Sequence, residues 1–568
     1  MSWIADNLAP IMFGSLLLFL LSGFPVAFAL AATGMVFGWI AVELALAPAA
    51  FFNALPLRLY GIMSNDVLLA IPFFTFMGLI LERSRMAEDL LDTIGQVFGP
   101  LRGGLAIAVV FVGAMLAATT GVVAASVIAM GLISLPIMLR YGYNRPLAAG
   151  VITASGTLAQ IIPPSLVLII IADQLGRSVG DMYKAAFVPA FMLVGIYVLA
   201  MVAVAVLRPK WAPALPPEAL VYHEPNGNSG HKSLAVLALL SVIVGNQVFT
   251  HWAALKPMLG GDASLTPPLD ERIVMGLLGG ITFAWLAAVL DKLLRANLLS
   301  KLAQQVTFVL IPPLLLVFLV LGTIFLGVAT PTEGGAMGAM GALLLALARR
   351  RLNVPLMRQA LDSAARLSIF VMFILIGSTI FGLTFQAING PAWVKALFAA
   401  LPGGELGFLL FVNALVFVLG FFLDFFEIAF ILLPLLLPVL QDMQINLVWF
   451  GVMIAMNMQT SFLTPPFGFA LFYLRSVAPK ADYTDKVTRK PIRAFSTADI
   501  YKGSLSFVVL QILMVALVLW KPQIVLQGLG EQKVLDVDKV NLDITPQEDM
   551  GEEPPPSFGP PTAPAPGN

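Results

Sequence analysis

The sequence predicts an all-α polytopic membrane protein, and three observations support that fold class. Of the 568 residues, 59% are hydrophobic and only 11% are charged, whereas a soluble domain carries about 25% charged residues. Apolar runs follow one another from Ile11 to Trp520, and many reach the roughly 20 residues that a helix needs to cross a bilayer. The runs are continuous rather than alternating, which excludes a membrane β-barrel.

Composition also excludes several classes of function. The formal net charge is zero, so we expect no nucleic-acid partner. Cysteine is absent, which rules out disulfides, thiolate metal sites and a cysteine nucleophile. The three histidines (His223, His231 and His251) fall in or beside connecting segments, which disfavours a membrane metalloenzyme. The N-terminus lacks a basic segment and an Ala-x-Ala cleavage site, so we expect the first apolar run to be retained.

The distribution of basic residues predicts the orientation. Cytoplasmic loops of multi-pass proteins are rich in Lys and Arg. With the N-terminus outside, the predicted inner loops hold 23 of the 32 Lys and Arg residues and the outer loops hold nine. We therefore expect a multi-pass protein of a bacterial inner membrane.

The first unit of the chain is predicted to cover residues 1–207. Within it the apolar stretch 103–139 is too long for one span, yet basic residues on both flanks place its two ends inside. It is either two spans with a minimal turn or a re-entrant hairpin, because non-helical backbone at membrane depth is tolerated where it lines a cavity or is buried in protein. A broken helix is expected over residues 147–172.

The rest of the chain repeats this pattern after an insertion. Residues 208–303 are predicted to form a cytoplasmic loop and two further helices. The second unit, 304–526, has a hairpin over 407–440, entered from the opposite side, and a broken helix over 446–474. The tail 527–568 is acidic and then Pro-rich, a composition that favours disorder.

The two units form an internal inverted repeat. The matched prolines are Pro25 with Pro331, Pro136 with Pro438, and Pro163-Pro164 with Pro465-Pro466. The first pair is offset by 306 residues and the others by 302. In the predicted topology the corresponding elements run in opposite directions. Inverted repeats are typical of secondary transporters, which bind substrate at the repeat interface near the bilayer midplane.

The double prolines give the broken helices their chemistry. Each proline removes a backbone donor and clashes with the preceding turn. The break frees carbonyl oxygens for a cation and exposes half-helix N-termini that favour an anion. Hydroxyl and amide side chains cluster around both breaks, at Thr153, Ser155, Thr157, Gln160, Asn457, Gln459, Thr460, Ser461 and Thr464. These are hard ligands of the kind an alkali cation prefers. The alternative is that each proline merely kinks a helix.

At these residues the chain resembles the large membrane subunit of tripartite ATP-independent periplasmic (TRAP) transporters. The matching stretches are Gly-Phe-Pro-Val-Ala-Phe-Ala-Leu (23–30), Ala-Ile-Pro-Phe-Phe-Thr-Phe-Met-Gly (70–78), Gly-Thr-Leu-Ala-Gln-Ile-Ile-Pro-Pro-Ser (156–165), Gly-Val-Ala-Thr-Pro-Thr-Glu-Gly-Gly-Ala (327–336) and Leu-Thr-Pro-Pro-Phe-Gly (463–468). The resemblance implies a sodium-driven, elevator-type importer of a small carboxylate. It also implies two partners, a small four-helix membrane subunit and a soluble periplasmic binding protein. Sodium is the coupling ion and no other cofactor is implied.

The resemblance further implies where ligands bind. A first sodium site would involve Thr119, Thr120, Gly121, Ser126, Ser155, Gly156 and Thr157. A second would involve Asp424, Thr460, Ser461 and Thr464. Substrate would lie between the breaks, near Pro163, Pro164, Ser165, Pro465 and Pro466. The motif Thr330, Pro331, Thr332 and Glu333 is the repeat equivalent of Pro25, so it has either a scaffold or a binding role.

The chain departs from the family pattern in three places. The first hairpin tip, residues 118–126, has fewer Gly and Ser residues than is usual. Aromatic residues stand at 425 and 426, where a hydroxyl is expected. The insertion adds two spans, an even number, so the downstream orientation is unchanged. It enlarges either the scaffold or the contact with the small subunit.

The acidic residues in apolar segments have alternative explanations. Asp424 has no Lys or Arg in its own apolar run, and an intramembrane carboxylate is costly unless it faces a cavity or a partner. A bound sodium ion would compensate it; otherwise it lies near the outer surface or is protonated. Glu427 could share either role. Glu333 opens a helix, so capping is its alternative.

Three classes of function remain open at this stage. The favoured one is a sodium-coupled importer subunit, since no Gly-x-x-x-x-Gly-Lys-Ser nucleotide motif occurs. A stand-alone carboxylate carrier would work without a binding protein or small subunit. A channel or structural subunit would show no sodium-dependent uptake. An enzyme is disfavoured, because clustered His, Cys or paired buried carboxylates are absent from the sequence pattern.

Overall fold

The computed structural model describes residues 2–220, 222, 230–259, 267, 269–295, 297–399, 401–485 and 487–529. Within these ranges nine helices are long and apolar enough to cross a membrane, or up to eleven if two bent helix pairs each form one span. The described strands are β1 (Tyr483–Thr484) and β2 (Pro491–Ile492), one antiparallel pair. The predicted all-α polytopic membrane fold is confirmed. The predicted disordered tail lies, beyond residue 529, outside the described residues.

The first unit contains the helices up to α11. Their bounds are α1 (Ser2–Asp6), α2 (Leu8–Leu21), α3 (Val26–Glu43), η1 (Ala49–Asn53), α4 (Ala54–Met63), η2 (Asp66–Leu69), α5 (Ala70–Arg83), α6 (Met86–Phe98), α7 (Gly104–Thr120), α8 (Val123–Arg140), α9 (Arg145–Thr157), η3 (Leu158–Gln160), α10 (Leu166–Gln174) and α11 (Val179–Leu207). The stretch predicted as the first hairpin holds α7 and α8. They meet at Gly121, whose φ of 60° is a left-handed conformation that glycine adopts without strain.

The insertion forms a closely packed helix pair. After η4 (Pro217–Ala219) it contains α12 (His231–Leu255), η5 (Pro257–Leu259) and α13 (Leu269–Leu294). A Cβ added at Gly245 would lie 2.7 Å from the Gly276 carbonyl oxygen, and one at Gly280 would lie 2.6 Å from that of Ser241. Small residues let membrane helices approach this closely. Only 6% of the α12 span is buried, so most of that helix faces outward.

The second unit begins at α14. Its elements are α14 (Lys301–Phe325), α15 (Pro331–Ala348), α16 (Val354–Ala387), α17 (Gly390–Ala399), α18 (Gly404–Leu419), α19 (Phe425–Asp442), α20 (Leu447–Leu463), α21 (Phe469–Val477), α22 (Thr497–Trp520), α23 (Gln523–Leu526) and η6 (Gln527–Leu529). The stretch predicted as the second hairpin holds α18 and α19. A turn at residues 420–424 joins them.

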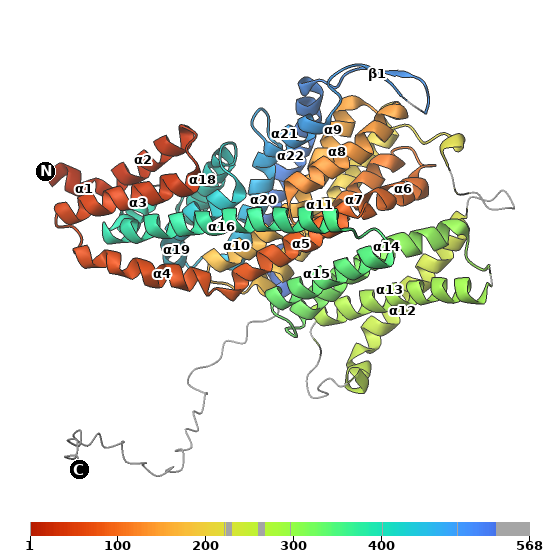
Figure 1. The fold of residues 1–568 in the computed structure, drawn as a ribbon, viewed down its shortest axis with the longest axis horizontal. Coiled ribbons are helices and arrows are strands. Elements are labelled where there is room, and N and C mark those ends of the chain that lie inside the picture. The colour runs from red at the N-terminus through yellow and green to blue at the C-terminus, as the bar shows by residue number, and fades with distance from the viewer. Residues whose placement is uncertain are drawn as a thin grey trace, which may run out of the picture. The chain divides into compact units, whose positions relative to one another are not determined.

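Helices of the two units exchange partners. α3 packs along α16, and α5 packs along α15 (Figure 1). In the same crossed manner α8 packs on α21, while α10 packs on α19. The broken helices lie at the centre of this arrangement, because every residue of α20 and residues 147–157 of α9 are buried.

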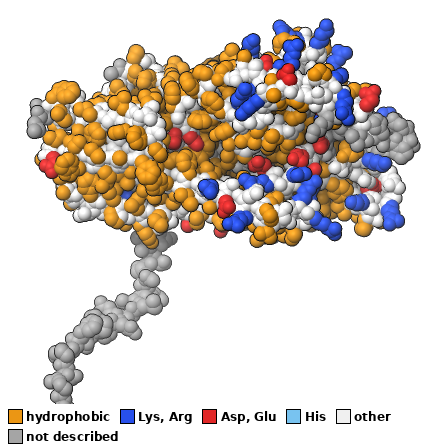
Figure 2. Space-filling model, turned by 45° about the horizontal axis from the view of Figure 1, so that its top comes forward, with side chains coloured by type: hydrophobic (Ala, Val, Ile, Leu, Met, Phe, Trp, Pro, Cys, Tyr) orange, Lys and Arg blue, Asp and Glu red, His pale blue; other side chains and the backbone are white. Residues whose placement is uncertain are grey.

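Basic side chains gather at one end of the molecule. Figure 2 shows Lys and Arg side chains concentrated at one end and hydrophobic side chains covering much of the rest. Residues on this end come from distant segments: Arg349 and Arg351, after α15, bind Asp89 of α6 at 3.1 and 2.9 Å. A concentration of cations at one end is the pattern expected of a cytoplasmic face.

The segment between α21 and α22 is fastened to α8 and α9 on this face. Arg140 donates to Asp485 at 3.0 Å, and Arg145 donates to the Ala494 carbonyl oxygen at 2.6 Å. The backbone N–H of Thr488 is the main cause that holds the pKa of Asp485 down to about 2, helped by the Thr488 hydroxyl and Arg140. Asp485 therefore both orders its own turn and anchors it to α8.

Replacing Asp485 by Asn should lower the melting temperature of the purified protein. A free Asp has a pKa of about 3.9, so the folded state binds this proton more weakly than the unfolded state. The stabilisation is thus complete above about pH 4 and is lost as the pH falls toward 2. The difference in melting temperature between wild type and Asp485→Asn should be full at pH 6 and shrink below pH 4.

Asp442→Asn provides the matched control. Its pair with Lys395 is exposed on both sides, at 49% and 62%, and such surface pairs contribute about 0–1 kcal/mol. Equal effects of the two substitutions at pH 6 would contradict an anchoring role for Asp485.

Candidate functional site

The first break separates α9 and α10. α9 gives way to the short η3, and residues 161–165 are non-helical and fully buried. Pro163 and Pro164 are joined by a cis peptide bond. Neither has a backbone N–H, so neither can continue the helical hydrogen bonds of α9. Ser165 caps α10: its hydroxyl donates to the Gln160 carbonyl oxygen at 2.6 Å and accepts from the Leu168 N–H at 3.5 Å. The side chain therefore satisfies backbone groups that the break would leave unpaired.

The second break lies between α20 and α21. Pro465 and Pro466 are again joined by a cis bond. This break is more open than the first, since Thr464 and Pro465 are half-buried and Pro466 and Phe467 are exposed. Tyr501 of α22 donates its hydroxyl to the Pro466 carbonyl oxygen at 3.2 Å. The two predicted substrate-binding breaks thus differ in their exposure.

The tip of the first hairpin lies against the first break. A Cβ added at Gly121 would lie 3.5 Å from the Pro164 carbonyl oxygen. The Thr120 and Ser126 hydroxyls are 2.8 Å apart, and those of Thr119 and Thr120 each donate to the Leu116 carbonyl oxygen at 2.9 Å. The predicted tip residues therefore lie together in the protein interior, beside the non-helical backbone of the first break.

The end of α9 packs between the two helices of this hairpin. A Cβ at Gly113 of α7 would lie 2.4 Å from the Ser155 Cβ, and one at Gly156 would lie 3.1 Å from the Val127 Cα of α8. The Ser155 hydroxyl is buried and has no hydrogen-bond partner among the described residues. The structure brings Ser155 and Gly156 against the hairpin, as a shared site requires, while Thr157 bonds to α20.

The tip of the second hairpin lies against α20. A Cβ at Gly420 would lie 2.1 Å from the Ser461 Oγ. The hydroxyls of Thr460, Ser461 and Thr464 donate to carbonyl oxygens of their own segment, at 3.1, 2.8 and 2.9 Å. Their lone pairs remain available as acceptors for a ligand.

Asp424 caps α19 in a reciprocal arrangement. Its carboxylate accepts from the Phe426 N–H at 2.9 Å, and its own N–H donates to Glu427 at 2.9 Å. The helix N-terminus stabilises negative charge here. The half-buried Asp424 therefore has a structural partner in the hairpin itself, whether or not a cation also binds it.

Aromatic side chains surround this second tip, a role that the sequence motifs did not predict for them. Phe422 and Phe467 have ring centroids 5.5 Å apart, and Phe425 and Phe462 have theirs 6.5 Å apart. They join the hairpin tip to the break on either side. The run Phe-Phe-Leu-Asp-Phe-Phe (421–426) was the available sequence signal.

The Thr330 motif lies at the start of α15, where it forms a capping box. Thr330 accepts from the Glu333 N–H at 3.2 Å, and Glu333 accepts from the Thr330 N–H at 2.8 Å. Thr332 donates to the Asp66 carbonyl oxygen at 2.6 Å. The Thr332 bond joins the motif, which includes Pro331, to η2 of the first unit rather than to either break.

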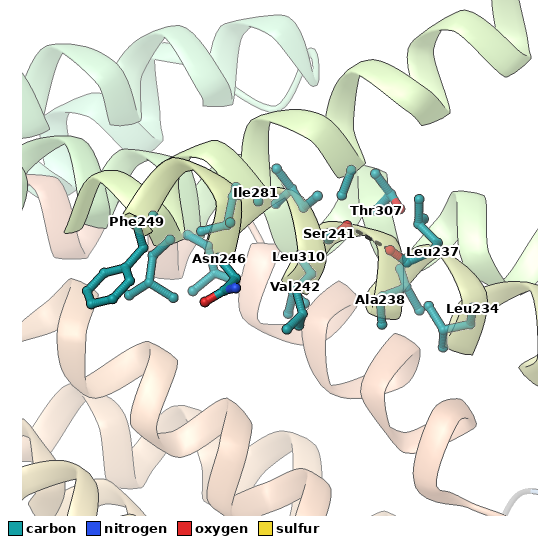
Figure 3. A pocket seen from close by; sticks show the side chains of 18 of the residues that line it. Leu234, Leu237, Ala238, Ser241, Val242, Asn246, Phe249, Ile281, Thr307 and Leu310 are labelled. Atoms are coloured by element: carbon teal, nitrogen blue, oxygen red, sulfur yellow. Dashed lines mark hydrogen bonds between the residues drawn. The ribbon is translucent and has the colours of Figure 1, made fainter. Parts of the chain in front are cut away.

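Two of the cavities found elsewhere are apolar. One of about 530 Å³ lies between α12, α13 and α14 (Figure 3), and one of about 470 Å³ lies among α6, α7, α11, α12 and α14, with Pro163 on its wall. The hydroxyls of Ser241 and Thr307 in the first cavity bond to their own helices. These cavities lack the clustered hydroxyls found at the breaks.

Among the residues that the structure describes, one side-chain hydrogen bond connects the two broken helices. Gln459 of α20 donates its Nε2 to the Thr157 Oγ1 of α9 at 3.3 Å, and both side chains are buried. The two residues are 302 apart, the offset that relates the double prolines. The two residues in contact are therefore related by the same sequence offset as the double prolines.

A family model described as "Tripartite ATP-independent periplasmic transporter, DctM component" matches residues 13–524. The C4-dicarboxylate TRAP transporter large permease protein DctM of Pseudomonas aeruginosa is 26% identical, over 75% of this chain and 81% of that protein.

Two further relatives have other named substrates. The isethionate TRAP transporter permease protein DctMQ of Oleidesulfovibrio alaskensis is 24% identical over 84% of this chain and 62% of its own length. The sialic acid TRAP transporter permease protein SiaT of Haemophilus influenzae is 21% identical over 83% of this chain and 61% of its own length. The chain thus spans less than two thirds of these two relatives.

Gly420→Ala should destabilise the protein by about 1–3 kcal/mol, because the new methyl group overpacks the contact with Ser461. The backbone at Gly420 has φ −66°, which alanine adopts freely. Thermal unfolding of the purified variant measures the effect. Gly195→Ala in α11 is the control: nothing lies within 4 Å of a Cβ there, so the gain in helix propensity should leave stability equal or higher. Equal melting temperatures for both variants would show that the tip does not press on α20.

Proposed function

The chain belongs to the DctM family of tripartite ATP-independent periplasmic transporters, and on this premise we propose that it imports a small organic acid together with sodium. The family model spans residues 13–524, nearly all of the described chain. The protein is accordingly a multi-pass permease of the bacterial inner membrane and not an enzyme. The sodium coupling, the substrate and the mechanism are the proposal.

The first proposed sodium site lies at the first hairpin tip. It comprises Thr119, Thr120, Gly121, Ser126, Ser155, Gly156 and Thr157. The observation that supports it is the unpartnered, fully buried Ser155 hydroxyl beside that hairpin. Buried polar atoms are normally hydrogen-bonded. A sodium ion is coordinated by hydroxyl and carbonyl oxygens, so it could satisfy this hydroxyl. The residues present therefore fit the ion.

The second proposed sodium site lies at the second tip. Asp424, Thr460, Ser461 and Thr464 supply one carboxylate and three hydroxyl oxygens, and the contact of Gly420 with Ser461 holds the tip against α20. An ion here would compensate the Asp424 charge beyond what the helix N-terminus provides. Asp424 would then link ion binding to the capping of α19.

The proposed substrate lies between the two breaks. Pro163, Pro164 and Ser165 precede the N-terminus of α10, while Pro465 and Pro466 precede that of α21. Helix N-termini favour anions, which supports a carboxylate. The named substrates of the relatives differ, so we leave the identity of the acid to a substrate screen.

The proposed mechanism is an elevator built from two inverted repeats, 1–207 and 304–526. The crossed packing of α3 on α16 and α5 on α15 supports it, because a two-fold relation between repeats exchanges these pairs. The exchange of α8–α21 with α10–α19 follows the same relation. In each repeat a hairpin and a broken helix would move together, with α6 as an arm that Asp89 fastens to Arg349 and Arg351.

The proposed partners are a small four-helix membrane subunit and a soluble periplasmic binding protein. The relative DctMQ supports the first, since this chain covers only 62% of that longer permease. The outward-facing α12 and the insertion around it, residues 208–303, are available to enlarge the scaffold or contact this subunit.

Sodium should raise the melting temperature of the purified protein relative to choline at equal ionic strength. A ligand that binds only the folded state stabilises it, by about 2.7 kcal/mol at 100 times its dissociation constant. The rise should be smaller in Asp424→Asn, which loses the carboxylate of the second site. Asp499→Asn is the control, because Asp499 closes a capping box at the start of α22. Its sodium response should match that of wild type. No sodium response in folded wild type would refute the proposal.

Uptake of the acid should require all three components. Proteoliposomes holding this chain and the small subunit should accumulate a labelled acid only with the binding protein present and an inward sodium gradient. Screening a panel of organic acids against the binding protein identifies the substrate first. Accumulation by this chain alone would instead indicate a stand-alone carrier, and flux that ignores the sodium gradient would indicate a channel.

A further inference from the structure

Four buried side chains form a hydrogen-bonded network where the broken helices meet. Gln459 donates to Thr157 at 3.3 Å, as described above. Gln511 of α22 donates its Nε2 to the Tyr197 hydroxyl of α11 at 2.7 Å, and the same Nε2 lies 3.5 Å from the Thr157 Oγ1. Thr157 donates its own proton to the Ala154 carbonyl oxygen at 2.9 Å. Its hydroxyl is therefore left to accept from both carboxamides.

Each repeat contributes the same two elements to this network. Thr157 and Gln459 come from the two broken helices, whereas Tyr197 and Gln511 come from the last long helices, α11 and α22. All four side chains are at most 2% exposed. Such a buried network holds its members in one arrangement, because the low dielectric makes an unpaired group costly.

The position of the network connects the two proposed sodium sites. Thr157 belongs to the first proposed site together with Ser155 and Gly156 on α9, and Gln459 precedes Thr460 and Ser461 of the second proposed site on α20. A shift in the end of either helix therefore moves the Thr157–Gln459 bond. The Oε1 atoms of Gln459 and Gln511 have no partner among the described residues, which is unexpected for a network that serves stability alone.

We propose that Gln511 and Tyr197 are positioning residues that hold Thr157 and Gln459 together and thereby couple the two sodium sites. The inference rests on the proposed function. Ordering of one broken helix by an ion lowers the cost of ordering the other through the shared hydrogen bonds, so the two ions bind cooperatively. The Tyr197 ring is held independently, edge to face with Phe507 at 5.3 Å. Removing its hydroxyl should therefore loosen Gln511 without disturbing the packing.

Sodium titrations of the melting temperature test this coupling with sodium chloride as the probe and choline as the balancing cation. In Gln511→Leu and Tyr197→Phe the half-saturating sodium concentration should rise by about fivefold or more. The steepness of the titration should also fall toward that of independent sites. Tyr197→Phe keeps the test valid if Gln511→Leu does not fold.

Thr384→Val is the matched control for a merely structural role. Its hydroxyl donates to the Gly34 carbonyl oxygen at 2.8 Å between α16 and α3, also in a buried place. This variant should lower the melting temperature without changing the half-saturation or steepness. If wild type responds to sodium, and Tyr197→Phe shows the same half-saturating concentration and steepness, the proposed coupling is wrong. The proposed sodium sites would then still stand. Absence of any wild-type response would overturn the proposed function and this inference with it.

Discussion

Unpaired backbone groups are costly in hydrocarbon, and two double prolines at the centre of the bundle create such groups. The molecule meets this constraint most fully at the first break, which is buried in protein, whereas Pro466 and Phe467 of the second break are exposed. Residues 161–165 are fully enclosed, and Ser165 binds backbone groups on both sides of the gap. Each hairpin tip is pressed against the broken helix of its own unit, where Gly121 and Gly420 leave room for no larger residue without adjustment. The oxygen-rich surroundings of the breaks follow from this arrangement.

The same constraint explains why two units are needed. A hairpin and a broken helix from one unit leave apolar faces uncovered, and the other unit covers them through the exchanged packing of α8 on α21 and α10 on α19. The Thr157–Gln459 bond then lies where equivalent positions meet. On the proposed coupling, a change at one break would alter the other through this bond, which is the property a coupled transporter requires.

Much of this could be predicted from the sequence because proline spacing and apolar length act locally. The bounds of both hairpins and both broken helices follow from Pro136, Pro438 and the double prolines to within a few residues. The contacts of Gln511 and Tyr197 could not, since they join residues 314 positions apart on helices whose apolar pattern does not reveal which face points inward. Nor does sequence show that the Phe residues around Asp424 meet Phe462 and Phe467. Such contacts depend on the tertiary approach of separate segments.

We propose that the two broken helices, each with its hairpin tip, bind sodium ions cooperatively. Equilibrium binding of radiolabelled sodium to the purified wild-type chain tests it most directly, without a substrate or a partner subunit. We expect saturable, cooperative binding of sodium that unlabelled sodium displaces and potassium or choline does not. Labelled sodium that shows no saturable binding to a folded sample, or that potassium displaces equally well, would contradict it.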